Sequence, residues 1–191
     1  MPHRIQMCIR DRYFECYDYV DLAWRHSYCG LFSLQKDGVT WYFLDNEQYF
    51  DRSELYGYMD DGERFAFFSR AVVRMLGHLK FWPEVIHCND WQTALVPIYL
   101  KDDGVREERF RTVRTVLTIH NIEYQGRYNP YILGDLFGLD SGWAKDGTLL
   151  MDGDVNLLKG AILCADAVTA VSDVYKRQPK QCGSYRPRTE S

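Results

Sequence analysis

The chain has 191 residues, of which 46% are hydrophobic, 15% aromatic and 26% charged. This length and composition allow one α/β or α+β domain with a sizeable core and leave no room for two full domains. No apolar run approaches the roughly 18 residues that a membrane helix requires. Integral membrane and collagen-like classes are therefore excluded, and a membrane partner is not expected.

The 23 Lys and Arg against 27 Asp and Glu give a net charge of −4. The charge is unevenly placed: residues 1–12 hold three Arg against one Asp, and residues 176–191 hold five Lys or Arg against one Glu. The middle of the chain is strongly acidic, so it offers no basic face that would displace the counterions of a nucleic acid. A nucleic-acid partner is not expected.

The six cysteines form no CxxC pair, and no apolar leader segment stands at the N-terminus. Disulfides are rare in the reducing cytoplasm. We therefore predict reduced thiols in a cytoplasmic protein.

The first recognisable elements form a hairpin and a helix. Residues 29–34 and 39–45 are typical of two strands on either side of an Asp37-Gly38 turn. The acidic run 60–63 can begin a helix whose apolar residues recur at spacings of three and four, which predicts one buried face. That face comprises Phe65, Phe68, Val72, Met75, Leu76 and Leu79.

The centre of the chain predicts a strand–helix–strand unit over 85–88, 91–100 and 115–119, and such a unit builds a parallel sheet. A second helix over 155–165 precedes a last strand over 167–171. The predicted fold class is α/β, with an open, doubly wound and mostly parallel Rossmann-like sheet.

Two segments lack such patterns. Residues 121–153 form a connection rich in Gly, Asp, Tyr and Asn, and a connection of this length is usually functional or partly helical. The tail over 178–191 has scattered charge and no apolar period, which predicts disorder.

Ligands of open parallel sheets bind at the carboxyl ends of the strands. Asp90 and Trp91 follow the strand over 85–88, and His120 follows the strand over 115–119. This combination suits a sugar, because an indole can cover the C–H groups of a sugar ring and polar side-chain atoms can bind its hydroxyls. From spacing alone, however, Asp90 is as well explained as a helix cap, Trp91 as core, and His120 and His87 as structural histidines.

Other chemistries have less support. The pairs Asp60-Asp61 and Asp102-Asp103 resemble metal-binding acid pairs, but a helix cap and a loop explain them better. The chain contains no GxGxxG after a strand, no GxxxxGK(S/T), no HExxH and no GxSxG. The sequence therefore gives no main support to a dinucleotide-binding protein, a P-loop protein, a zincin or an α/β-hydrolase. We predict no metal and no cofactor.

Seven short runs, in order between about residues 19 and 175, closely resemble the bacterial glycogen synthases and plant starch synthases. They are 42–47 (YFLDNE), 55–58 (LYGY), 60–70 (DDGERFAFFSR), 87–94 (HCNDWQTA), 118–126 (TIHNIEYQG), 155–160 (VNLLKG) and 165–172 (ADAVTAVS).

The resemblance implies a GT-B enzyme, in which two Rossmann-like domains face each other across a cleft. Residues 13–175 would be most of the first domain, whereas 1–12 and 176–191 do not match and are expected to be non-native ends. The implied reaction transfers glucose from ADP-glucose to the non-reducing 4-hydroxyl of an α-1,4-glucan with retention. The groups that hold the diphosphate belong to the absent C-terminal domain, so the chain alone is expected to be inactive.

The resemblance also implies functional roles for residues of this chain that match the family's motifs. Asp90 and His120 resemble the family's catalytic cleft residues. The implied substrate-binding residues are Tyr56, Trp91, Asn121 and Lys159. Two alternatives stay open: a glucan-binding module that transfers nothing, and the nucleotide-sugar domain of another GT-B glycosyltransferase.

Overall fold

The computed structural model of the chain describes residues 12–79, 81–104 and 107–171. The predictions for residues 1–11 and for the tail lie outside these ranges. No helix among the described residues is long and apolar enough to cross a membrane.

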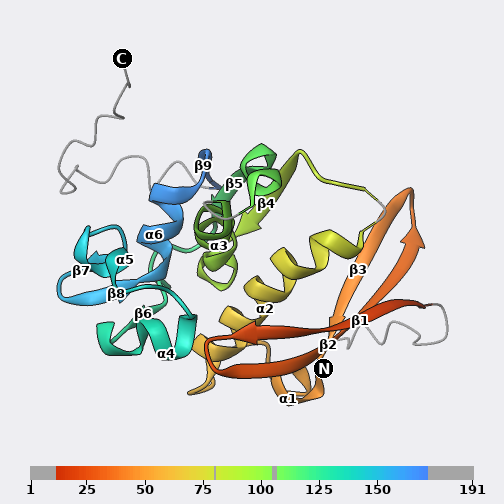
Figure 1. The fold of residues 1–191 in the computed structure, drawn as a ribbon, viewed down its shortest axis with the longest axis horizontal. Helices are drawn as coiled ribbons and strands as arrows, with labels where there is room; N and C mark the ends of the chain where they lie inside the picture. The colour runs from red at the N-terminus through yellow and green to blue at the C-terminus, as the bar shows by residue number, and fades with distance from the viewer. Residues whose placement is uncertain (1–11, 80, 105–106, 172–191) are drawn as a thin grey trace.

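The described part of the chain begins with a three-stranded antiparallel sheet of order β1-β2-β3 (Figure 1). Its strands are β1 (Tyr13–Leu22), β2 (Arg25–Lys36) and β3 (Val39–Asp45). The predicted hairpin is confirmed: Lys36 pairs with Val39, and Asp37 and Gly38 between them have φ of 55° and 77°. Two central residues with positive φ make the type I′ turn that matches the twist of the strands.

Strand β1 was not predicted. Its outward face is aromatic, with the rings of Tyr17 and Tyr19 both in contact with that of Tyr28 on β2. Its inward face includes Asp18, which forms an ion pair with Arg74 at 2.7 Å. Because aromatic residues face outward and a carboxylate faces inward, the sequence lacks the apolar–polar alternation that marks a half-buried strand.

The short helix α1 (Glu47–Phe50) leads through a loop to α2 (Asp61–Met75), which the turn η2 (Leu76–His78) extends. The expected buried face is wrong in part. Met75 and Leu76 are buried, but the other four members are only half-buried. The most deeply buried apolar side chains are instead Ala66, Phe67, Ala71 and Val73. Helix α2 contacts β1, α3 and α4, so it is covered on more than one side (Figure 1).

The predicted strand–helix–strand unit is confirmed. Strands β4 (Val85–Asn89) and β5 (Arg114–Ile119) are parallel neighbours, and β9 (Ala167–Ala170) lies parallel on the far side of β5. The expected helix from Trp91 starts as the 3-10 turn η3 (Trp91–Thr93) and becomes the α-helix α3 (Leu95–Gly104). The turn η4 (Glu108–Thr112) leads into β5, and α6 (Leu157–Cys164) precedes β9.

The two faces of this parallel sheet differ. Thr115, Leu117 and Ile119 of β5 are buried. The opposite face carries a row of hydrogen bonds, from His87 Nε2 to Thr118 Oγ1 at 2.6 Å and from there to Thr169 Oγ1 at 2.7 Å. His87 is exposed and belongs to this row, so its structural role stays a prediction.

The long connection is partly helical, as expected. It contains η5 (Pro130–Ile132), α4 (Leu133–Phe137), α5 (Gly142–Lys145) and a small antiparallel sheet of order β6-β8-β7. The strands of that sheet are β6 (Arg127–Tyr128), β7 (Leu150–Met151) and β8 (Asp154–Asn156). The buried Tyr99 of α3 donates its hydroxyl proton to the carbonyl of Phe137 at 2.7 Å, which ties the connection to the core.

Candidate functional site

The carboxyl ends of β4 and β5 bring the predicted residues together. Because the strands are parallel neighbours, the residues that follow them meet at one edge of the sheet. The backbone N–H of His120 donates to Asp90 Oδ1 at 2.7 Å, and that of Asn121 donates to the same oxygen at 3.3 Å. His120 Nε2 lies 3.0 Å from Asn89 Oδ1. We call these four residues the rim.

Asp90 does not cap the helix that follows it. No hydrogen bond joins its side chain to the first turn of η3, so the cap hypothesis is wrong. The turn is held instead by Thr93, whose Oγ1 accepts from Asn89 N at 2.7 Å and donates to Asn89 O at 2.8 Å. Sequence reasoning missed Thr93, although a hydroxyl four residues after a strand end is a usual partner for such a turn.

Trp91 lies beneath the rim. It is only 8% exposed, and its ring centroid lies 5.1 Å from that of Phe65 and 6.5 Å from that of Tyr128. Gly126 has a φ of 61°, and a Cβ built on it would approach Trp91 Cε3 to 2.6 Å. Position 126 therefore requires glycine. The burial of Trp91 supports the alternative that its indole is part of the core.

Tyr56 reaches the same region from a loop between α1 and α2. It is 54% exposed, and its ring centroid lies 6.3 Å from that of Tyr124, which follows the rim on the connection after β5. Tyr56 is thus linked to the connection after the rim through Tyr124, to which sequence reasoning assigned no role.

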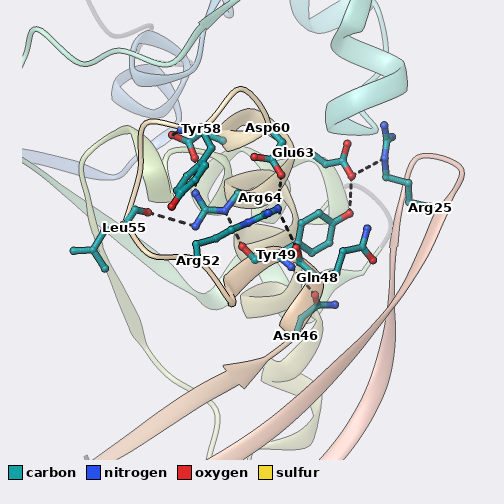
Figure 2. Close-up of polar contacts among 11 residues, drawn as sticks. Arg25, Asn46, Gln48, Tyr49, Arg52, Leu55, Tyr58, Asp60, Glu63 and Arg64 are labelled. Carbon is teal, nitrogen blue, oxygen red and sulfur yellow. Dashed lines mark hydrogen bonds and ion pairs between the residues drawn. The ribbon is translucent and has the colours of Figure 1, made fainter. Parts of the chain in front are cut away.

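A buried ion pair between Arg64 and Asp61 fixes the loop that carries Tyr56. Figure 2 shows the Arg64 side chain between Tyr49 and Leu55. Arg64 donates from Nε to Tyr49 O at 2.7 Å, from Nη2 to Leu55 O at 3.4 Å, and to Asp61 Oδ1 at 2.5 Å. Asp61 Oδ2 in turn accepts from the backbone N–H of Gly57 and of Tyr58, at 2.5 and 3.1 Å. The backbone on both sides of Tyr56 is therefore anchored to α2.

The acid pairs are engaged by cations and donors rather than arranged around a metal. Asp60 pairs with Arg52 at 2.7 Å and makes no side-chain cap bond, so the predicted cap is wrong (Figure 2). Asp103 pairs with Arg70 at 2.6 Å, and Asp102 accepts from Trp143 Nε1. Within the described ranges, no group of three or more His, Cys, Asp or Glu is placed to hold a metal ion.

Lys159 supports the connection. Its Nζ donates to Gly147 O at 2.8 Å and to Leu150 O at 2.5 Å. Its backbone N–H donates to Asn156 Oδ1 at 2.9 Å, which caps the first turn of α6. The ammonium group thus binds two carbonyl oxygens and is not a freely solvated charge.

The thiol of Cys88, next to the rim residue Asn89, is buried. Burial raises the pKa of the Cys88 thiol to about 12, despite the opposing hydrogen bond with Thr93. Only a negligible fraction would be thiolate at neutral pH. The four described cysteines, Cys16, Cys29, Cys88 and Cys164, are all free.

Comparison with known proteins decides the family. The family model of the starch synthase catalytic domain matches residues 3–183 of this chain. The chain belongs to the starch synthase catalytic domain family. The solved catalytic domain of starch synthase IV from Arabidopsis thaliana, bound to ADP and acarbose, has a TM-score of 0.75 and 30% identity to this chain. The match covers 86% of this chain and 35% of that one, and it confirms the predicted fold class, the first Rossmann-like half of a GT-B enzyme.

The curated relatives are longer than this chain. The glycogen synthase of Lactococcus lactis is 50% identical over 164 residues, which cover 86% of this chain and 34% of the relative. The glycogen synthase of Lactobacillus acidophilus is 46% identical over 159 residues, 83% of this chain and 33% of the relative. The chain therefore spans about a third of the length of the relatives that it matches.

Proposed function

We propose that this chain supplies the first Rossmann-like domain of a glycogen synthase, which transfers glucose from ADP-glucose to the non-reducing 4-hydroxyl of an α-1,4-glucan. The observation that carries the proposal is the convergence of Asp90, His120 and Asn121 at one sheet edge, in a chain 50% identical to a glycogen synthase. The Arabidopsis relative, bound to ADP and acarbose, supports nucleotide and glucan ligands for the complete protein.

The chemistry divides between two halves. Breaking the bond between glucose and diphosphate builds positive charge on the sugar and negative charge on the phosphate. The rim presents the exposed imidazole of His120 and the amide of Asn121, which can orient sugar hydroxyls. The cations for the phosphate would come from a second domain, which is a partner that this chain requires.

Within this proposal the residues have different tasks. His120 and Asn121 contact the sugar, and Tyr56 with Tyr124 forms an aromatic wall beside it. Trp91 supports the rim from beneath, because its buried ring has little surface to offer a ligand. Lys159 holds the connection through two carbonyls and is a supporting residue in this proposal.

A chimera tests the proposal. Residues 13–171 of this chain would replace the matching third of the Lactococcus lactis glycogen synthase, and incorporation of glucose from ADP-glucose into glycogen would be measured. We expect the chimera to transfer glucose and the 191-residue chain alone to transfer none. A folded chimera that binds glycogen but transfers nothing would favour the non-catalytic glucan-binding module instead.

A further inference from the structure

Asp90 has a backbone conformation that an aspartate rarely adopts. Its φ is 56° and its ψ is −173°, a region occupied almost only by glycine. Such strain persists only where the surrounding contacts over-determine the conformation.

Three sets of contacts do so here. The backbone N–H of Asp90 donates to Thr118 O at 2.9 Å, which continues the ladder between β4 and β5. The Thr93 hydroxyl binds the backbone on the preceding residue, Asn89. Asp90 Oδ1 accepts from the backbone N–H groups of His120 and Asn121. The main chain and the side chain are thus fixed from separate directions.

The side-chain contacts suggest why an aspartate stands here in place of glycine. Glycine would adopt this conformation without strain but would have no oxygen for the two N–H donors. These donors lie where β5 ends, at the residues that carry the rim's imidazole and amide. Backbone N–H groups bound to a carboxylate form charge-assisted hydrogen bonds, which are shorter and stronger than neutral ones.

We infer that Asp90 is a positioning residue, whose carboxylate clamps the backbone at His120 and Asn121 and which acts on glucose transfer through them. The part that concerns transfer rests on the proposed function, whereas the clamp itself does not. Because one oxygen accepts both hydrogen bonds, an asparagine oxygen at this position can replace it.

The clamp is tested in the 191-residue chain by NMR. In the wild type and in Asp90→Asn, the amide protons of His120 and Asn121 should resonate downfield and exchange slowly. In Asp90→Ala and in Asp90→Gly, both amides should shift upfield and lose protection. Asp90→Gly should unfold at a higher temperature than Asp90→Ala because glycine relieves the strained φ. Amides that do not respond to the loss of the carboxylate would overturn the clamp.

The kinetic role is tested in the chimera. Asp90→Asn should keep kcat within about threefold of the wild type, whereas Asp90→Ala should lower it by roughly tenfold or more. In a His120→Ala background, Asp90→Ala should lower kcat by a smaller factor than it does alone, because residues that act as a unit are not additive. If Asp90→Asn loses as much rate as Asp90→Ala while its amide signals stay in place, the charge of Asp90 acts directly and the inference is wrong. An inactive wild-type chimera would count against the proposed function, and the NMR result would still decide the clamp.

Discussion

Replacing Arg64 with methionine removes the cation that anchors the loop carrying Tyr56. Arg64 is 3% exposed and Asp61 is 7% exposed, so the pair is shielded from water. In Arg64→Met, Asp61 keeps its two backbone donors but loses its counter-charge. The carbonyls of Tyr49 and Leu55 lose the donors that Arg64 supplies.

The expected loss follows from this burial. Removing one partner of a buried ion pair costs about 3–5 kcal/mol, because the remaining charge stays buried without compensation. For a chain of this size 1 kcal/mol corresponds to about 2–4 °C in Tm, so we expect a Tm lower by about 6–20 °C. Adding Asp61→Asn removes the unpaired charge. The double variant should therefore lose about 0.5–3 kcal/mol less free energy of unfolding than the sum of the two single variants.

Urea and thermal unfolding of the 191-residue chain, followed by circular dichroism, measure these differences. The matched control is Arg52→Met, which breaks the Arg52–Asp60 pair, whose side chains are 31% and 43% exposed. Exposed pairs contribute about 0–1 kcal/mol, so this control should stay close to the wild type. A loss below about 1 kcal/mol for Arg64→Met would refute the argument that the buried pair anchors the loop.

Two further predictions concern the core and the pH dependence of stability. A Cβ on Gly160 would lie 2.1 Å from Leu149 Cδ2. Gly160→Ala should therefore overpack the core at a cost of about 1–3 kcal/mol. This cost exceeds or cancels the gain of about 1 kcal/mol that alanine brings in helix propensity. The control Gly134→Ala meets only ordinary contacts and should not destabilise the chain in urea unfolding. Burial raises the pKa of Asp18, but hydrogen bonds from Arg74 and His78 outweigh it and lower that pKa to about 2. The stability that Asp18 contributes is therefore present above its ordinary pKa of 3.8 and lost as the pH falls toward 2. In Asp18→Asn, the free energy of unfolding should fall less steeply with acid than in the wild type. The same slope in both proteins would contradict this prediction.

Local sequence rules were sufficient where one short signal decides the structure. The Asp37-Gly38 pair demands two positive φ values, which only a tight hairpin turn satisfies. The strand–helix–strand unit was predictable because two short runs rich in β-branched and apolar residues flank an apolar helix at the spacing of a parallel crossover. That unit also explains why Asp90 and His120 were expected at one edge of the sheet.

Tertiary contacts decided the rest. The buried side of α2 was predicted in part only, because Ala66 and Ala71 gain their burial from neighbours that no helical period reveals. The role of Asp90 depends on a backbone angle and on donors 30 residues away, neither of which the spacing shows. Trp91 and Lys159 likewise owe their surroundings to the long connection, whose path had no sequence signal.

The most direct test of the central claim compares two histidine variants of the chimera. His120 is exposed at the rim, and His26 is exposed on β2, where it stacks on Tyr19 outside the rim. We expect His120→Ala to lower kcat for glucose transfer from ADP-glucose by roughly tenfold or more while the Tm stays unchanged, and His26→Ala to keep the wild-type rate. Wild-type turnover in His120→Ala would remove the rim from the reaction and contradict the account.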